Sequence, residues 1–291
     1  MRPGPDALVH AQDKGVMRAK LVEIGVPCPR HRIVSDPADV VAFAAEGDGF
    51  PVVLKTVRGG YDGKGVWVVE SAEEAADPSA PVSPCSRRRR STSYGSWRRT
   101  SSAPRTARPS PTRSSRSQQV NGVCDTVIAP APDLDESLAL QAEEMALRIA
   151  KELGVVGHLA VELFQTADGR ILVNELAMRP HNSGHWTQDG AVTSQFASHV
   201  RAVLDLPAGR PARPRAPGPS CATSWAATTR TCTPAYLHCM ARDPQLKIHM
   251  YGKDVKPGRK VGHVNTYGTD LADVLDRARH AAGYLRGTIT E

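Results

Sequence analysis

The 291-residue sequence lacks the features that would take a chain into or across a membrane. No uninterrupted apolar run approaches the length that spans a bilayer, and the first residues, MRPGPDALVH, contain no signal-peptide core. The six cysteines (positions 28, 85, 124, 221, 232 and 239) form no CxxC pair and no cysteine–histidine spacing typical of zinc sites. We therefore expect a cytoplasmic protein whose cysteines are free thiols.

Two segments lack the residues that build a hydrophobic core. Residues 81–119 hold ten arginines but no Asp, Glu, Lys, Leu, Ile, Phe or Met, and residues 207–234 hold four arginines and lack the same types and Val. The net charge of the chain is +7, so without these fourteen arginines the remainder is −7. Such segments bury too little apolar area to offset the entropy of ordering, so we expect both to be disordered or poorly packed.

The rest of the chain alternates between helix and strand patterns. Apolar spacing predicts helices over 11–26, 137–153, 192–206 and 270–285. β-rich runs predict strands over 51–57, 65–70, 249–252 and 262–268, and a hairpin over 158–177 that turns on Asp168 and Gly169. Because there is no strict βαβ repeat, the predicted fold class is α+β or mixed α/β.

The predicted hairpin brings two carboxylates together. A two-residue turn pairs Ala167 with Arg170, which places Glu162 directly opposite Glu175 on one face of the sheet. Facing like charges are destabilising unless a cation lies between them, and the adjacent Asn174 amide completes an oxygen-rich set that suits Mg²⁺. The alternative is a solvated face with two ordinary surface glutamates.

A glycine-rich loop, RGGYDGKG at 58–65, joins two predicted strands. Its four glycines allow close approach of a phosphate, while Arg58 or Lys64 could neutralise its charge. Lys55, inside the preceding apolar strand, is a second candidate phosphate contact. The loop lacks the GK[ST] ending of a Walker A motif, and a plain glycine-rich turn is the alternative.

Residues 174–189, NELAMRPHNSGHWTQD, are dense in polar groups directly after the hairpin. The donors available to an anionic ligand there are Arg179, His181, Asn182, Ser183 and His185. His181 and His185 also have the spacing of a zinc pair, but no helix is expected across Asn-Ser-Gly after Pro180. A basic run near the C-terminus is either a solvated loop or a phosphate anchor; it comprises Lys253, Lys256, Arg259 and Lys260.

Several of these motifs resemble one known family. GGYDGKG, the VELF and VNELA strands, and RPHNSGHWTQDGA followed by TSQF closely resemble the ATP-grasp family of 5-(carboxyamino)imidazole ribonucleotide synthases, the ATPase partners of bacterial phosphoribosylaminoimidazole carboxylase. KDVKPGRKVGHVN resembles the family's C-terminal signature. The resemblance covers about residues 8–77, 120–206 and 236–291. It implies an ATP-grasp fold with a small β-rich C-terminal domain.

The resemblance also implies a reaction. Bicarbonate and ATP would give carboxyphosphate, whose carboxyl group passes to the exocyclic amine of 5-aminoimidazole ribonucleotide in de novo purine biosynthesis. The implied enzyme is a magnesium-dependent ligase that binds small molecules rather than nucleic acid or membrane, with a homodimer for intact members. The alternative is a basic RNA-binding adaptor using residues 81–119, which offers only Tyr94 and Trp97 to stack on bases.

The resemblance assigns roles residue by residue. It implies that ATP phosphates are held by Lys55 and by the loop from Gly60 to Val66, including Gly63 and Gly65. Mg²⁺ would be bound by Glu162 and Glu175, with Asn174 beside them. The groups that reach substrate or carboxyphosphate would be Tyr61, Asp62, Lys64, Arg179, His181, Asn182 and Ser183. The 5′-phosphate would be bound by Lys253 and Arg259.

The sequence departs from the family pattern in three places. The N-terminal Rossmann-like domain is expected to be missing, because only eleven residues precede Gln12. The Glu-x-Phe-Val strand that binds adenine and ribose is replaced by the arginine-rich segment, and Met178 stands where proline is usual. The expected organisation is an ATP-grasp domain over 1–206, an aberrant segment over 207–235 and a small domain over 236–291.

Both unusual segments begin and end abruptly and are rich in Arg, Ser, Pro, Ala and Thr. This composition is typical of a GC-rich coding strand translated out of frame. We therefore predict that about residues 79–119 and 208–234 are read in a shifted frame. The chain as written is then expected to be inactive, with the adenine-binding strand missing.

Overall fold

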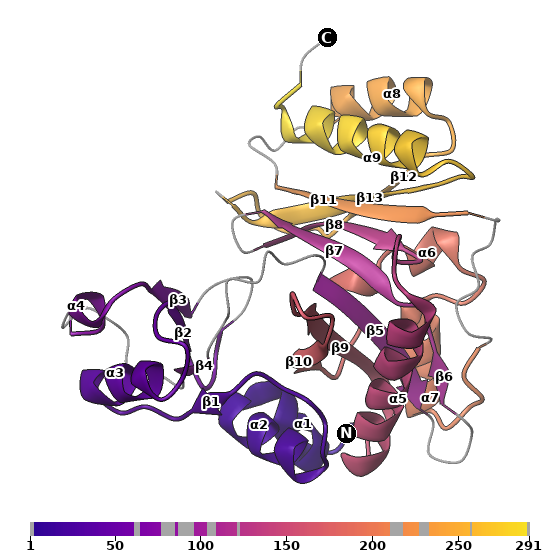
Figure 1. Ribbon diagram of the computed structural model, residues 1–291. Coiled ribbons are helices and arrows are strands. Elements are labelled where there is room, and N and C mark those ends of the chain that lie inside the picture. The colour runs from indigo at the N-terminus through magenta and orange to yellow at the C-terminus, as the bar shows by residue number, and fades with distance from the viewer. Residues whose placement is uncertain are drawn as a thin grey trace.

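The computed structural model describes residues 3–60, 65–76, 85–86, 96–103, 109–120, 123–209, 218–226, 233–256 and 258–289 (Figure 1). Its helices are α1 (Pro5–Gln12), α2 (Lys14–Glu23), α3 (Pro37–Ala45), α4 (Ala72–Ala75), α5 (Glu136–Glu152), the 3₁₀ turn η1 (Asn182–Gly184), α6 (Thr187–Gly190), α7 (Gln195–Val203), α8 (Thr233–Arg242) and α9 (Leu271–Arg286). Its strands are β1 (His31–Arg32), β2 (Val52–Lys55), β3 (Val66–Val69), β4 (Cys85–Ser86), β5 (Ser96–Ala103), β6 (Ser110–Pro111), β7 (Ser115–Val120), β8 (Val123–Ala129), β9 (Gly157–Gln165), β10 (Ile171–Ala177), β11 (Ser220–Ala226), β12 (Lys247–Met250) and β13 (Lys260–Tyr267).

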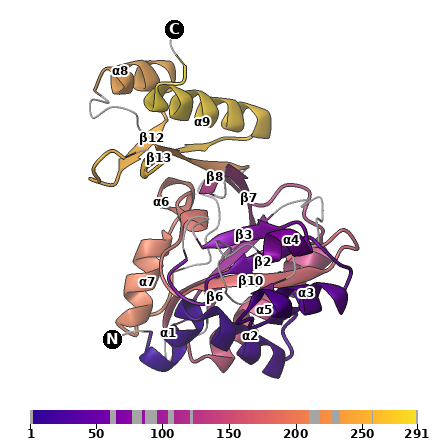
Figure 2. The ribbon, with the colours of Figure 1, turned by 90° about the vertical axis from the view of Figure 1, so that its left-hand side faces the viewer.

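The described strands form two sheets. The larger has the order β10-β9-β5-β7-β8-β11-β13-β12, with β6 paired to β5, and the smaller has the order β1-β4-β2-β3. Helices α5 and α7 pack near β9, and α9 covers β11 and β13 with α8 outside it (Figure 1). The small sheet lies beside the β9–β10 end of the large one (Figure 1 and Figure 2). The mixed α/β composition agrees with the predicted fold class.

Among the described residues, four apolar clusters hold these layers together, the smallest of them around Val127 of β8 and Trp186. The largest joins α1, α2 and α5 to β9 and β10, with Leu21, Ile149 and Leu163 among its buried members. A second core lies between α9 and the β11–β13 pair. A third packs α3 against the small sheet. The site strands β9 and β10 therefore rest on the largest of these clusters.

The long helix was predicted correctly and has clear end signals. The Asp135 side chain accepts hydrogen bonds from the backbone N–H groups of Ser137 and Leu138, and Gly154 follows the helix with a φ of 59°. The prediction of one continuous helix over 11–26 was wrong, because the structure has two helices in this part of the chain. Two helices, α1 and α2, meet at Asp13, whose carboxylate caps the second by accepting from Val16 N–H.

Other predicted elements differ mainly in their bounds. The strands over 51–57, 65–70, 249–252 and 262–268 correspond to β2, β3, β12 and β13, and the closing helix to α9. The helix predicted over 192–206 is shorter. It begins at Gln195, where the Ser194 side chain accepts from Ala197 N–H, and ends at Val203.

The predicted hairpin forms, but its turn is not the predicted two-residue turn. Thr166 N–H donates to Arg170 O at 2.8 Å, and the first strand pair is Gln165 with Ile171. The register is therefore one residue away from the predicted one near the turn. A bulge between Val173 and Glu175 corrects it.

The expectation of disorder was wrong for the described parts of both arginine-rich segments. Strands β4, β5 and β6 and all but the last residue of β7 lie within residues 79–119, and β11 lies within 207–235. Strand β5 pairs with β9 along its whole length, and β11 lies between β8 and β13. Strand β5 pairs on one side with the apolar β9, and β7 pairs on one side with the apolar β8, so backbone pairing offsets the poor composition of these strands. The remaining residues of the segments lie outside the described part.

Within the described residues, no helix is long and apolar enough to cross a membrane. Cys28, Cys124, Cys221 and Cys239 are free thiols, as expected. The side chains of Cys85 and Cys232 lie outside the described part of the chain.

Candidate functional site

The two hairpin glutamates face each other as predicted. Glu175 on β10 is the register partner of Glu162 on β9, and their side chains are 37% and 16% exposed. The bulge that aligns them is held by Arg18 of α2, whose guanidinium donates to the carbonyl oxygens of Val173 and Asn174. This alignment was therefore predicted correctly, although by a turn geometry that the structure does not have.

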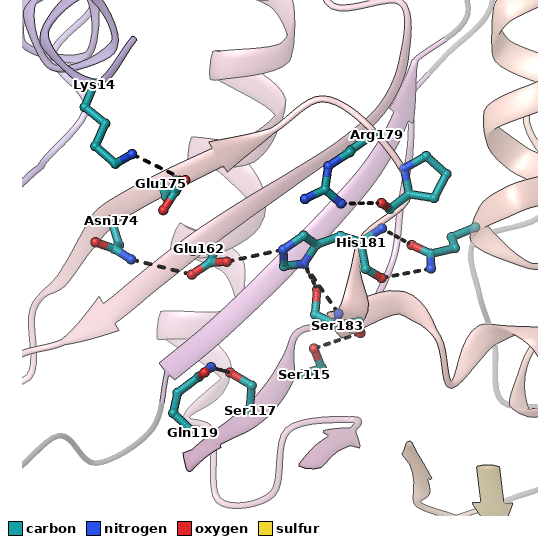
Figure 3. Close-up of polar contacts among 12 residues, drawn as sticks. Lys14, Ser115, Ser117, Gln119, Glu162, Asn174, Glu175, Arg179, His181 and Ser183 are labelled. Atoms are coloured by element: carbon teal, nitrogen blue, oxygen red, sulfur yellow. Dashed lines mark hydrogen bonds and ion pairs between the residues drawn. The ribbon is translucent and has the colours of Figure 1, made fainter. Parts of the chain in front are cut away.

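Asn174 links the carboxylates to the small sheet. Its Oδ1 accepts a hydrogen bond from Lys55 Nζ at 2.8 Å. Its Nδ2 donates to Glu162 Oε2 at 3.5 Å (Figure 3). Burial lowers the pKa of Lys55 to about 8, and the nearby Arg18 charge adds to the lowering. Lys55, Asn174 and Glu162 thus form a connected polar network, which joins the candidate phosphate contact in β2 to the predicted carboxylate pair of the hairpin.

A second cation at this site was not predicted from the sequence. Lys14, at the start of α2, has its Nζ 4.0 Å from Glu175 Oε1 (Figure 3). Next to it, Asp13 accepts from Arg58 Nε at 2.9 Å, which ties the glycine-rich loop to α2. No local pattern marks Lys14, because its role depends on a contact 161 positions further along the chain.

Two facing carboxylates beside two lysines fit a magnesium–phosphate group. Mg²⁺ is usually held by one or two carboxylates and completed by substrate phosphates and water. Among the described residues there is no group of three His, Cys, Asp or Glu side chains that could hold a metal ion without such help. Glu162 and Glu175 therefore match a metal carried with a phosphate better than a self-contained metal centre.

The loop after the hairpin brings His181 to Glu162. His181 Nε2 lies 3.3 Å from Glu162 Oε1, and His181 Nδ1 lies 3.0 Å from Ser183 Oγ (Figure 3). Both His181 and Ser183 are buried, and Asn182 is half-buried. Arg179 is exposed and donates to the carbonyl of Pro180, so in this structure it does not touch the carboxylates.

His181 and His185 do not form the zinc pair considered above. The ring of His185 stacks on His263 of β13, with centroids 4.5 Å apart. His181 points instead toward Glu162 (Figure 3). The two imidazoles therefore serve different neighbours.

The glycine-rich loop is described only in part. Tyr61, Asp62, Gly63 and Lys64 lie outside the described residues, while Gly60 is half-buried and Val66 is exposed at the start of β3. Gly65 has a φ of 73°, and a Cβ there would lie 2.5 Å from Thr56 Oγ1. Only glycine fits that position, which supports a tight loop between β2 and β3.

The predicted phosphate anchors near the C-terminus are exposed. Lys253 Nζ lies 5.1 Å from the centroid of the Tyr251 ring, and Arg259 Nη1 donates to Asp254 O at 3.4 Å. No contact joins either side chain to Glu162 or Glu175 among the interactions of the described residues. Their role in binding a 5′-phosphate stays a prediction.

Comparison with known families identifies the class to which this arrangement belongs. The model of the ATP-grasp domain matches residues 19–86 and 112–196, which include Lys55, Glu162 and Glu175. The model of the phosphoribosylaminoimidazole carboxylase C-terminal domain matches residues 224–277. The chain is thus an ATP-grasp protein with a second, characteristic C-terminal module.

Individual relatives narrow the family. An N5-carboxyaminoimidazole ribonucleotide synthase of Mycobacterium tuberculosis is 46% identical over 97% of this chain and 67% of its own length. The crystal structure of the synthetase of that name from Thermus thermophilus has a TM-score of 0.83 and 31% identity, covering 100% of this chain and 76% of that one. The chain belongs to the N5-carboxyaminoimidazole ribonucleotide synthase family.

A structure from Aspergillus clavatus connects the family to its ligands. It is described as the synthase in complex with ADP and 5-aminoimidazole ribonucleotide, and it matches with a TM-score of 0.85 and 26% identity over 99% of this chain and 76% of that one.

The ATP-grasp model leaves residues 87–111 unmatched, within the segment expected to be out of frame. The C-terminal model begins at residue 224, inside the second such segment.

Proposed function

We propose that this chain carries the machinery of an ATP-grasp ligase that carboxylates 5-aminoimidazole ribonucleotide with bicarbonate in purine biosynthesis. The observation that carries this proposal is the alignment of Glu162 with Glu175 beside the Lys55–Asn174 hydrogen bond. The names of its relatives supply the substrate and product classes. The RNA-binding alternative has no support from these relatives.

Lys55 and Lys14 would bind the phosphates of ATP. Both ammonium groups lie close to the carboxylates, so each can contact a phosphate oxygen while Glu162 and Glu175 face the metal. Mg²⁺, when bound, would neutralise charge on the transferring phosphoryl group. Asn174 would hold the Lys55 ammonium and the Glu162 carboxylate at a fixed separation.

The reaction then proceeds in two transfers. A bicarbonate oxygen attacks the γ-phosphorus of ATP and ADP leaves, which gives carboxyphosphate. The exocyclic amine of the ribonucleotide next attacks the carboxyl carbon, inorganic phosphate leaves with the C–O bond electrons, and the nitrogen gives up one proton to the departing phosphate. His181 lies next to Glu162, and Asn182 and Ser183 follow it in the same loop; all three would contact the bicarbonate-derived group. Tyr61, Asp62, Lys64, Arg179, Lys253 and Arg259 keep the roles implied by the family resemblance.

The two arginine-rich segments remain proposed to be products of a shifted frame that lower the activity. Their strands complete the sheet, but the composition of residues 81–119 still lacks the residues that the family uses to bind adenine. We expect the chain as written to turn over slowly or not at all. Resequencing the gene tests the frame hypothesis directly.

The function is tested by measuring ADP formation from ATP with both substrates. The chain as written and a chain with both segments in the corrected frame should be assayed side by side. The expected result is Mg²⁺-dependent ADP formation that requires bicarbonate and 5-aminoimidazole ribonucleotide, at least in the corrected chain. Absence of that dependence in both chains would contradict the proposal. Light scattering would test the expected homodimer.

A further inference from the structure

Gln195, the first residue of α7, is fully buried and contacts the loop that carries His181. Its side chain is 1% exposed. Its Oε1 accepts from the backbone N–H of His181 at 2.8 Å, and its Nε2 donates to the carbonyl oxygen of the same residue at 2.8 Å. One carboxamide therefore binds both backbone polar groups of His181, which fixes the orientation of that residue as strand pairing would.

A third contact of the carboxamide determines a histidine tautomer. Gln195 Nε2 lies 3.2 Å from His185 Nδ1. Because the bond from His181 N–H identifies Oε1 as the acceptor, the second N–H of the amide donates to Nδ1 of His185. Burial lowers the pKa of His185 to about 3, so its ring is neutral with the proton on Nε2.

The backbone of Gln195 is held by the same loop. Gln195 N–H donates to Thr187 Oγ1 at 2.9 Å, and Thr187 Oγ1 donates to Gly184 O at 2.5 Å. Gly184 lies so close that a Cβ there would be 2.3 Å from Gln195 Oε1. The turn from His181 to Thr187 thus packs closely around the Gln195 side chain.

The contacts of Gln195 affect the candidate metal site through His181. His181 Nε2 lies 3.3 Å from Glu162 Oε1, and the position of the His181 backbone sets where this imidazole can lie. We propose that Gln195 is a positioning residue that holds His181 against Glu162, and with it the bicarbonate side of the reaction centre. This inference rests on the proposed function for its catalytic meaning, but its structural part stands independently.

The structural part is tested by nitrogen NMR of the histidine rings in the full-length chain. In the wild type we expect His185 to be unprotonated at Nδ1 and protonated at Nε2 at neutral pH. In Gln195→Glu, a carboxylate oxygen replaces the donor, so the proton should move to Nδ1. A wild-type His185 with its proton on Nδ1, or an unchanged tautomer in Gln195→Glu, would overturn the proposal. This readout needs no turnover, so it decides the proposal even if the proposed function fails.

The catalytic part is tested in whichever chain shows turnover. Gln195→Glu should lower kcat about 10- to 100-fold at pH 8, the order expected when a contacting group is misplaced. It should leave the KM for ATP within about twofold, because Gln195 does not touch Lys55 or Asn174. The rate should partly recover as the pH falls, because a protonated carboxyl regains one donor. Wild-type kcat at every pH would overturn the proposal.

A matched pair of variants separates positioning from general loss of stability. Gln195→Ala and Gln188→Ala each remove a carboxamide from neighbouring helices, and Gln188 Oε1 has no hydrogen-bond partner in the described part of the chain. Gln195→Ala should lower kcat and shift the His181 ring signals. Gln188→Ala should change kcat by no more than about twofold and leave the His181 ring signals in place. Equal effects of the two variants would overturn the proposal.

Discussion

Strands β9 and β5 lie side by side in one sheet but are specified in different ways. Strand β9, GHLAVELFQ, is buried along most of its length by its own apolar residues. Strand β5, SWRRTSSA, has almost none, yet it pairs with β9 from Ser96–Phe164 to Ala103–Gly157. The difference shows that a strand with few apolar residues in its sequence can still be paired along its whole length through the backbone.

Strand β7, which pairs with β5 on the side opposite β9, is also polar. Its Ser115 and Ser117 are buried at 2% and 3% exposure, where an apolar strand would carry larger residues. In β11, Thr223 Oγ1 lies 3.4 Å from Thr126 Oγ1, so buried hydroxyls in these segments find polar partners. Small, hydrogen-bonded side chains thus allow a polar strand to enter the sheet, although they contribute less apolar burial.

The largest expected effect is on stability, from truncating an apolar side chain in β9. Leu163 is 0% exposed in the main core. Leu163→Ala should lower the free energy of unfolding by about 2–5 kcal/mol, because it removes buried methyl groups and leaves a cavity. Urea unfolding followed by circular dichroism measures the change.

The matched variant in the polar strand is Ser117→Ala. It should change the free energy of unfolding by no more than about 1 kcal/mol, because a single hydroxyl contributes little net stability. The comparison between the strands would fail if the two variants were equally destabilising. It would also fail if Leu163→Ala left the unfolding midpoint unchanged.

A smaller effect is expected from the residue that aligns the two glutamates. Arg18 binds the carbonyls of Val173 and Asn174 at the bulge, and lysine cannot reproduce its forked geometry. Arg18→Lys should weaken Mg²⁺-dependent ATP binding by about tenfold, or about 1.4 kcal/mol, which lies in the range of about 1–3 kcal/mol lost when a buried acceptor is left unpaired. Calorimetric titration measures the affinity. Exposed Arg148→Lys on α5 is the control, and equal affinities in both variants would contradict this role of Arg18.

The smallest effect is a pH dependence that arises from Lys55. Its pKa is lowered to about 8 in the folded chain, so its charge is present below pH 8 and is lost above it. ATP affinity should therefore fall as the pH rises from 7 to 9, by up to about tenfold. The same shift makes stability rise with pH between about 8 and 10.5, where the unfolded chain binds the proton that the folded chain releases.

Lys55→Arg tests the assignment of this pH dependence. Arginine stays charged throughout the range, so the fall in affinity between pH 7 and 9 should disappear. An unchanged fall in Lys55→Arg would assign the dependence to another group.

The hairpin and its carboxylates could be predicted because alternation of apolar and polar residues is a local signal. The bulge at Asn174 could not, because it depends on Arg18, 156 residues earlier in the chain. Lys14 was missed for the same reason. The position of His181 depends on the buried carboxamide of Gln195, and no periodicity in the loop indicates that contact.

The strands of the arginine-rich segments were missed for a different reason. Composition predicts whether a segment can bury enough apolar area on its own. Strands β5 and β11 instead lie inside a sheet formed with other parts of the chain. Each lies between two strands, and its backbone groups pair with those of both neighbours. Local sequence cannot report such long-range pairing.

The central claim is that the facing glutamates hold Mg²⁺ together with ATP. It is tested most directly by titrating ATP into the chain with and without Mg²⁺, in the wild type and in Glu175→Gln. We expect Mg²⁺ to strengthen wild-type binding, and the variant to lose at least about 100-fold in Mg²⁺-dependent affinity while its circular dichroism spectrum is unchanged. Exposed Glu144→Gln on α5 is the control. Equal Mg²⁺-ATP affinity in the wild type and Glu175→Gln would contradict the account and leave the pair as ordinary surface glutamates.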